Sequence, residues 1–144
     1  MKINIIIADY SNIYSIDREN RRNATANHCA PLSVLKRAMH DSFDDVRSNV
    51  AGSFHITVEM LICLSNDEDY AVRSAVAIHP FTPPGTLKKL SEDRDWCVRA
   101  NVANNINTPA NVLKTLINST KTSSNDSVSN MAWHTLRKLN ANAG

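Results

Sequence analysis

The sequence predicts an all-α protein, a solenoid of about five two-helix repeats with a 26-residue period. The first observation is that Val72-Arg-Ser-Ala-Val-Ala77 recurs as Val98-Arg-Ala-Asn-Val-Ala103 and as Val46-Arg-Ser-Asn-Val-Ala51. The second is that Thr82-Pro83 with Leu87 and Leu90 recurs as Thr108-Pro109 with Leu113 and Leu116. The same stride leads back to Asn20-Arg-Arg-Asn-Ala24 without a gap. Self-similarity at a fixed period of this length is typical of a solenoid.

We expect one helical-repeat domain over residues 1–144: an N-terminal cap at 1–16, four repeats at 17–118, and a loop with an atypical C-terminal capping repeat at 119–144. The cap can be interpreted in two ways. Ile3, Ile5 and Ile7 alternate as in a strand. A longer set follows helical spacing and favours a helical cap: Ile3, Ile6, Ile7, Tyr10, Ile13 and Tyr14.

The first helix of each repeat is predicted to begin after an aspartate N-cap, at Asp17, Asp44, Asp69 and Asp95. In the third repeat this helix should bury Val72, Ala75 and Val76, and Asn or Gly near its end supplies a C-cap in the other repeats. The second helix should begin at Thr82 and Thr108, with threonine as the cap and proline in the first turn. Leu87 and Leu90 are its expected core contacts.

The C-terminal segment departs from the period. A Ser/Thr-rich loop at 119–125 precedes a closing helix that contains Met131, Ala132, Trp133, Leu136 and Leu139. We expect Trp133 to cover the exposed end of the array.

The pattern Asp-x-x-Val-Arg-x-x-Val-Ala followed by Thr-Pro-x-x-x-Leu-x-x-Leu resembles the leucine-rich-variant (LRV) repeat, a relative of HEAT-like helical repeats. The resemblance is best at residues 69–116, fair over 17–68 and weak over 124–140. It implies short paired helices wound into a right-handed superhelix. Some members carry a cysteine cluster for an iron–sulfur centre, but this chain has only Cys29 near its N-terminal part, so we expect no cofactor.

Composition limits the functional classes. The net charge of +2 is too small to indicate nucleic acid by itself, and the three cysteines form no C-x-x-C pair for a disulfide framework or a zinc site. No apolar run suits a signal peptide or a membrane span, so a cytoplasmic protein without membrane contact is expected. The five histidines are scattered and no Gly-rich phosphate loop is present, so we expect neither catalysis nor a bound metal.

Equivalent positions of a solenoid align in space, so columns of residues are the candidate sites. The clearest column is Arg21, Arg47, Arg73 and Arg99, which could bind phosphates or acidic peptides. Alternatively, an aspartate three or four residues before each arginine forms an Asp–Arg ladder, which is the interpretation we favour. A second column, Asn23, Asn49 and Asn101, either bonds to the turn of a neighbouring repeat or edges a binding surface; we favour the former.

Two further features concern the surface. Lys36-Arg37, Lys88-Lys89 and Lys114 should make the second helices basic, whereas the turns between repeats are acidic. The second repeat has Ile62-Cys63 at the basic position, and Phe54 as an added aromatic, so it is a candidate interface unless these residues pack beneath a neighbour. Tyr70 and Trp96 follow the capping aspartates and either anchor a partner or pack across the repeat boundary.

These features predict a non-enzymatic module that presents a helical-repeat surface to a protein or peptide. The alternative is a nucleic-acid-binding HEAT-like protein that uses the arginine column and the basic helices. A third possibility is a structural role in which array ends stack, so the expected state is a monomer or a weak end-to-end oligomer.

Overall fold

Every regular element that the structure describes is helical. The computed structural model describes residues 11–15, 17–119 and 126–142, and within these ranges it contains no strand. The elements are a short 3₁₀ helix, η1 (Ser11–Tyr14), and the α-helices α1 (Arg18–Ala26), α2 (Leu32–Ala38), α3 (Asp44–Ala51), α4 (Val58–Leu64), α5 (Tyr70–Ile78), α6 (Pro84–Leu90), α7 (Trp96–Asn104), α8 (Ala110–Ser119) and α9 (Asp126–Asn142). The all-α prediction is confirmed.

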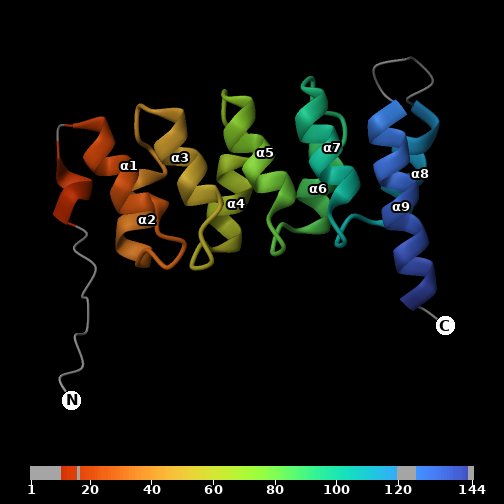
Figure 1. Cartoon of the computed structure of the whole chain (residues 1–144), viewed down its shortest axis with the longest axis horizontal. Coiled ribbons are helices and arrows are strands. Elements are labelled where there is room, and N and C mark those ends of the chain that lie inside the picture. Colours follow the sequence, from red (N-terminus) through yellow and green to blue (C-terminus); the bar gives the residue numbers. More distant parts are fainter. Residues whose placement is uncertain (1–10, 16, 120–125, 143–144) are drawn as a thin grey trace.

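The helices form an array of pairs that follow one another along the long axis of the molecule (Figure 1). Helices α1, α3, α5, α7 and α9 pack in series, each on the next, and α2, α4 and α6 each contact the two helices that flank them in the chain. Helices α1, α3, α5 and α7 begin at residues 18, 44, 70 and 96, so their starts have the spacing of the sequence repeat. We call these four the first helices, and α2, α4, α6 and α8 the second helices.

The connections between helices lie at two opposite edges of the array (Figure 1). The segments 39–43, 65–69 and 91–95 lead from a second helix to the next first helix, and all of them contain aspartate; we call this side the charged edge. The segments 27–31, 52–57, 79–83 and 105–109 lead from a first helix to its second helix. They contain no Asp, Glu, Lys or Arg, so we call this side the uncharged edge.

The core repeats with the sequence. Val46, Val72 and Val98 of the first helices are fully buried, and so are Leu35, Leu61, Leu87 and Leu113 of the second helices. The predicted core residues Val72, Val76, Leu87 and Leu90 are therefore confirmed, while Ala75 is only partly buried. Each short helix buries one apolar stripe against its neighbours, and this packing stabilises helices too short to persist alone.

The N-cap prediction is confirmed for three of the four aspartates. The carboxylates of Asp17, Asp69 and Asp95 accept hydrogen bonds from the backbone N–H two residues later. It is wrong for Asp44, because α3 already begins at that residue and Phe43 is its N-cap. An acidic side chain in the first turn still favours the helix electrostatically.

The prediction that Thr82 and Thr108 cap the second helices is wrong. The N-cap of α6 is Pro83, and the buried Thr82 hydroxyl donates to the carbonyl of Val76 at 2.5 Å. Thr108 donates to Val102 in the same way, at 2.6 Å. Both hydroxyls therefore add a second hydrogen bond to carbonyls near the end of the preceding first helix, which also accept from the backbone N–H groups of His79 and Asn105, respectively. A threonine cap is found instead at Thr57, which has the register of Pro83 and was not predicted as a cap: its hydroxyl accepts from Met60 N–H at the start of α4.

The closing helix is present as α9, but Trp133 does not cover the end of the array. Its side chain is 58% exposed, whereas Val128, Ala132 and Thr135 are buried. The reason is helical phase: these three residues share the face that packs on α7 and α8, and Trp133 lies about 100° around the helix from Ala132. The prediction of a helical cap over residues 1–16 lies largely outside the described residues, as does the loop at 120–125.

Candidate interaction surfaces

The arginine column runs along the charged edge and is engaged within the chain. Arg21, Arg47 and Arg73 each form a two-pronged salt bridge, with Nε and Nη2 donating to the two carboxylate oxygens of Asp41, Asp67 and Asp93, respectively. The Nε–oxygen distances are 2.6–2.7 Å, and no more than 14% of any of these side chains is exposed. The two N–H groups with which each guanidinium group would bind a phosphate or a carboxylate of a ligand are therefore already bonded to an aspartate of this chain.

The partner aspartates differ from those predicted. The sequence interpretation paired each arginine with the aspartate three or four residues earlier, but Asp17, Asp69 and Asp95 cap helices instead. The actual partner lies twenty residues after the arginine, in the next turn of the charged edge. The prediction of an Asp–Arg ladder is therefore correct, but the aspartates that form it are not the predicted ones.

The ladder continues from turn to turn through the backbone. Arg47, Arg73 and Arg99 donate through Nη1 to the carbonyls of Asp41, Asp67 and Asp93, at 2.7–2.8 Å. Each of these turns is thus held by one arginine at its carboxylate and by the next arginine at its carbonyl. Twenty residues after Arg99 the sequence has Ser119, so the ladder has no aspartate at that register.

Electrostatics support the ladder. Burial alone would raise the pKa of Asp67, but the hydrogen bonds from Arg47 and from the Asp69 backbone N–H outweigh it, so the pKa lies below its ordinary value. The same balance lowers the pKa of Asp41 and of Asp93. The hydrogen bond to Asp67 raises the pKa of Arg47. These groups therefore stay charged and paired at neutral pH.

The asparagine column also bonds between repeats. Asn49 Nδ2 donates to Arg22 O and Thr25 Oγ1 at 3.2 and 3.3 Å, and Asn101 Nδ2 donates to Ser74 O and Oγ at 3.3 and 2.6 Å. Their acceptors belong to the preceding first helix, not to a turn as predicted. Asn23, in α1, is exposed.

A second polar column, which the sequence interpretation missed, lies beneath the uncharged edge. It consists of Asn27, Ser53, His79 and Asn105, spaced by 26 residues. The last three are buried, and each bonds to the backbone of the preceding repeat: Ser53 to His28 O, His79 to Ser53 O, and Asn105 to Ala77 O and His79 O. The signal in the sequence is a polar residue at the same position of every repeat. It is hard to recognise because the residue type changes between asparagine, serine and histidine.

His79 is held as one neutral tautomer. The Phe81 backbone N–H can only donate, so Nδ1 accepts from it, and Nε2 must then carry the proton that is donated to Ser53 O. Burial lowers the pKa of His79, and the bond to Ser53 O only partly opposes this. The residue is a structural link between turns at neutral pH.

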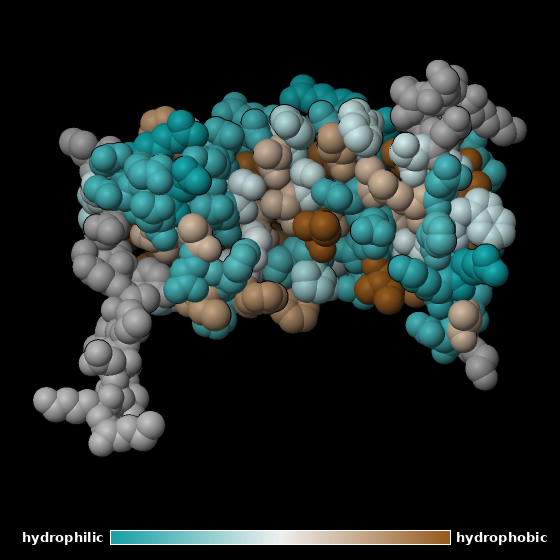
Figure 2. All heavy atoms as spheres, viewed as in Figure 1, coloured by the Kyte–Doolittle hydropathy of each residue, from teal (hydrophilic) through white to brown (hydrophobic). Residues whose placement is uncertain are grey.

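The uncharged edge exposes large apolar side chains. Phe54 and Phe81 are 61% and 60% exposed, and Ile78 and Ile106 are 54% exposed. Leu32 and Val58, at the starts of α2 and α4, are exposed beside them. Figure 2 shows several patches of hydrophobic colour along this lower rim, with hydrophilic ones between them, whereas the upper rim is mostly hydrophilic. Exposed apolar side chains that gather along one edge in this way often mark a contact site.

The second-helix face combines basic and apolar residues. Lys88 and Lys89 are exposed, and Lys89 Nζ donates to Asn66 Oδ1. Ile62, at 46%, and Cys63 are exposed too, so they do not pack beneath a neighbouring helix. Across α2, α4, α6 and α8 the basic residues are Lys36, Arg37, Lys88, Lys89 and Lys114, and the acidic residue is Glu59.

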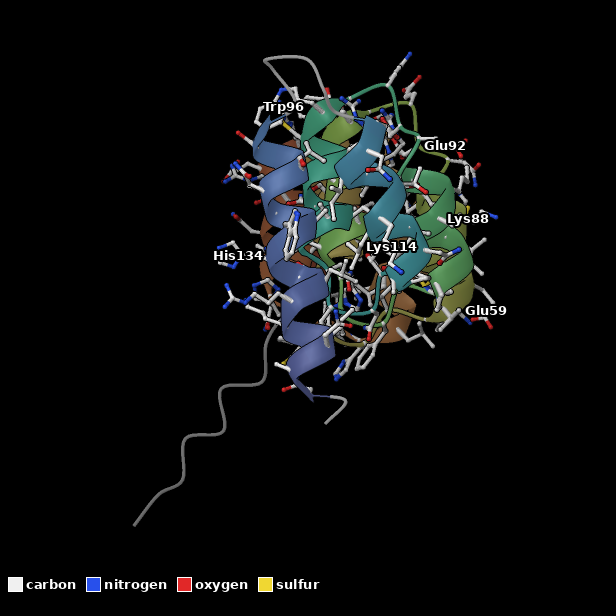
Figure 3. All side chains as sticks on the ribbon, turned by 90° about the vertical axis from the view of Figure 1, so that its right-hand side faces the viewer. Glu59, Lys88, Glu92, Trp96, Lys114 and His134 are labelled. Carbon is white, nitrogen blue, oxygen red and sulfur yellow. The ribbon has the colours of Figure 1, made fainter. Side chains whose placement is uncertain are left out.

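Tyr70 and Trp96 occupy the first positions of α5 and α7, directly after the capping aspartates. Both side chains are half exposed. They lie on the first-helix side of the array, away from the basic residues of the second helices, as Trp96 and Lys88 illustrate in Figure 3. They are therefore separate from the surface that contains Ile62.

The part of the chain that the structure describes contains no group of three or more His, Cys, Asp or Glu side chains placed to hold a metal ion. None of its helices has both the length and the apolar character needed to span a membrane. The comparison with known proteins adds no assignment, because no family model and no curated protein matches the chain.

Proposed function

We propose that the protein is a non-enzymatic interaction module that binds a protein or peptide partner along its uncharged edge. The single observation that carries this proposal is the row of exposed apolar side chains on segments without any formal charge. Such a row loses unfavourable contact with water when a partner covers it. The charged edge has a different role, since its arginines and aspartates are engaged in the internal ladder.

The arrangement of the array is part of the proposal. We infer a right-handed superhelix of about five repeats, on the basis of the LRV-like pattern and of helix starts separated by 26 residues. In such an array the exposed apolar residues of successive turns lie at regular intervals. A long, continuous contact line then becomes available to one partner.

The test is affinity capture with matched variants of the full chain. The variant Phe54→Ser/Phe81→Ser removes two exposed aromatic side chains from the uncharged edge, and the control Tyr70→Ser/Trp96→Ser removes two from the first-helix side. The proposal predicts that a protein retained by the wild type and by the control is lost from the edge variant. Retention by the edge variant, or loss from both variants, would contradict it.

The alternative, nucleic-acid binding, would have to rest on the basic second helices, because three arginines of the column already pair with aspartates. A gel-shift assay at low salt tests it directly, since phosphate contacts give strongly salt-dependent binding. Binding that Lys88→Glu/Lys89→Glu abolishes would favour the alternative.

A further inference from the structure

Helix α4 interrupts a basic surface with an apolar stripe. At the register of Lys36 in α2 and Lys88 in α6, the intervening helix α4 has Ile62. One turn earlier in α4 lies Val58, which is 43% exposed. We call Val58, Ile62 and Cys63 the α4 stripe; it is flanked on both sides by helices that carry adjacent basic pairs.

The surface beside the stripe is hollowed. A groove of about 420 Å³ lies between α2 and α4. Its lining residues are Leu32, Lys36, Met39, Thr57, Glu59 and Met60. Because methionine side chains are flexible, Met39 and Met60 can adapt to apolar side chains of different shapes that enter the groove.

On the other side of α4 the surface has open space. A Cβ atom built on Gly85, near the start of α6, would meet no atom within 4 Å. The exposed side chains of the α4 stripe themselves lie between Lys36 of α2 on one side and Lys88 and Lys89 of α6 on the other.

Charge identifies the kind of partner. Glu59 is the acidic residue of the second helices, and it is hydrogen-bonded to its own backbone N–H and to the Thr57 hydroxyl, which lower its pKa. Figure 3 shows Glu59 near the lower edge, with Lys88 and Lys114 higher on the same side of the molecule. A ligand that covers the stripe therefore meets lysines on its flanks.

We propose that the second-helix face binds an acidic amphipathic helix, whose apolar side covers the α4 stripe and whose carboxylates pair with Lys36, Lys88 and Lys89. This proposal rests on the proposed function, since it names the chemistry of the protein partner. Helix-in-groove binding presents apolar anchors at positions i, i+3, i+4 and i+7, with acidic residues on both flanks. Lysine pairs at exposed rims mainly determine which partner is accepted and how fast it associates.

The test uses three fluorescently labelled synthetic peptides of equal length and fluorescence anisotropy with the full chain. The first is an acidic helix with leucines at i, i+3, i+4 and i+7 and glutamates on its flanks. The second replaces every glutamate by lysine, and the third scrambles the acidic peptide so that no apolar stripe remains. The proposal predicts that the first peptide binds at least ten-fold more tightly than the other two.

Variants of the protein locate the binding. Ile62→Ser and Lys36→Glu/Lys88→Glu should each weaken binding of the acidic peptide at least ten-fold. Trp133→Ser, an exposed aromatic change on α9, should leave it unchanged. Circular dichroism of each variant checks that the fold is retained.

Three results would overturn the proposal: no binding of the acidic peptide, binding of either control peptide as tightly as the acidic peptide, or full binding to a folded Ile62→Ser variant. These results leave the proposed function separately testable. A captured protein that needs Phe54 and Phe81 but tolerates Ile62→Ser would support the interaction module and reject this partner chemistry. Peptide binding together with failure of the capture test would support this partner chemistry and reject only the uncharged edge as the contact surface.

Discussion

At the residue scale, the arginines of the charged edge illustrate how a repeated side chain acquires a structural role. Arg47 bonds to the carboxylate of Asp67 and to the carbonyl of Asp41, and so it connects two successive turns. Nearly all of both charged side chains is withdrawn from water. Leaving one such charge without its partner costs more than the pair itself contributes.

Asp67→Ala should therefore destabilise the protein by about 3 kcal/mol, because it leaves Arg47 mostly buried without its carboxylate. Asp45→Ala is the matched control, since Asp45 pairs with the half-exposed Arg18 and should cost less than about 1 kcal/mol. Urea unfolding followed by circular dichroism measures both. Equal losses in the two variants would show that the ladder does not stabilise the fold.

His79 predicts a pH dependence at the uncharged edge. Its folded pKa lies below the ordinary value of about 6.5, so the unfolded chain binds the proton more readily. The stability that the neutral ring contributes is complete above about pH 6.5 and is lost as the pH falls towards the folded pKa. The carboxylates of the ladder act in a lower window, below about pH 4.

His79→Asn should reduce this loss, because asparagine already occupies the same column at residue 105 and bonds without titrating. Unfolding free energies at pH 7.5 and pH 5.5 provide the measurement. The wild type should lose more stability than His79→Asn between the two values. A wild-type stability that does not change between them would contradict the neutral-ring account.

At the element scale, the sequence predicts features that lie within one helix better than contacts between different helices and turns. As predicted, Asp69 caps α5, and Leu87 and Leu90 are the buried apolar residues of α6. Both features could be predicted because each depends on the residues of a single helix. The Arg47–Asp67 pair depends on how a turn folds back after an intervening helix, which spacing alone does not encode. Thr82 was misassigned for the same reason, since its hydroxyl bonds back to α5.

Among the candidate surfaces, the second repeat was recognised because Ile62 and Cys63 break a basic pattern. The uncharged edge was missed as a whole. Its signal in the sequence is an absence of charged residues in four segments of the period, whereas a column is recognised by residues that are present. Phe54 was noticed singly, and only the structure brings it into one row with Ile78, Phe81 and Ile106.

Gly85→Ala should stabilise α6 by about 0.5–1 kcal/mol, because alanine loses less backbone freedom on folding and its methyl group meets no neighbouring atom. Thermal unfolding would show a higher midpoint. A lower midpoint would mean that the space beside Gly85 is already filled.

At the scale of the whole molecule, the two edges of the array differ in the kind of residue they carry and in the role we assign to them. The charged edge connects successive turns by the arginine ladder, and the uncharged edge carries exposed apolar side chains over a buried polar column. One side thus stabilises the order of the helices while the other remains available for contact. The repeat extends both roles along the molecule.

We propose that a protein partner contacts the uncharged edge and not the charged edge. Site-directed photo-cross-linking in the cells that produce the protein tests it most directly, with benzoylphenylalanine replacing Phe81 or, as the comparison, Asp44. We predict a discrete cross-linked protein from the Phe81 position and none from the Asp44 position. Cross-links from Asp44 alone, or equally from both positions, would contradict the account.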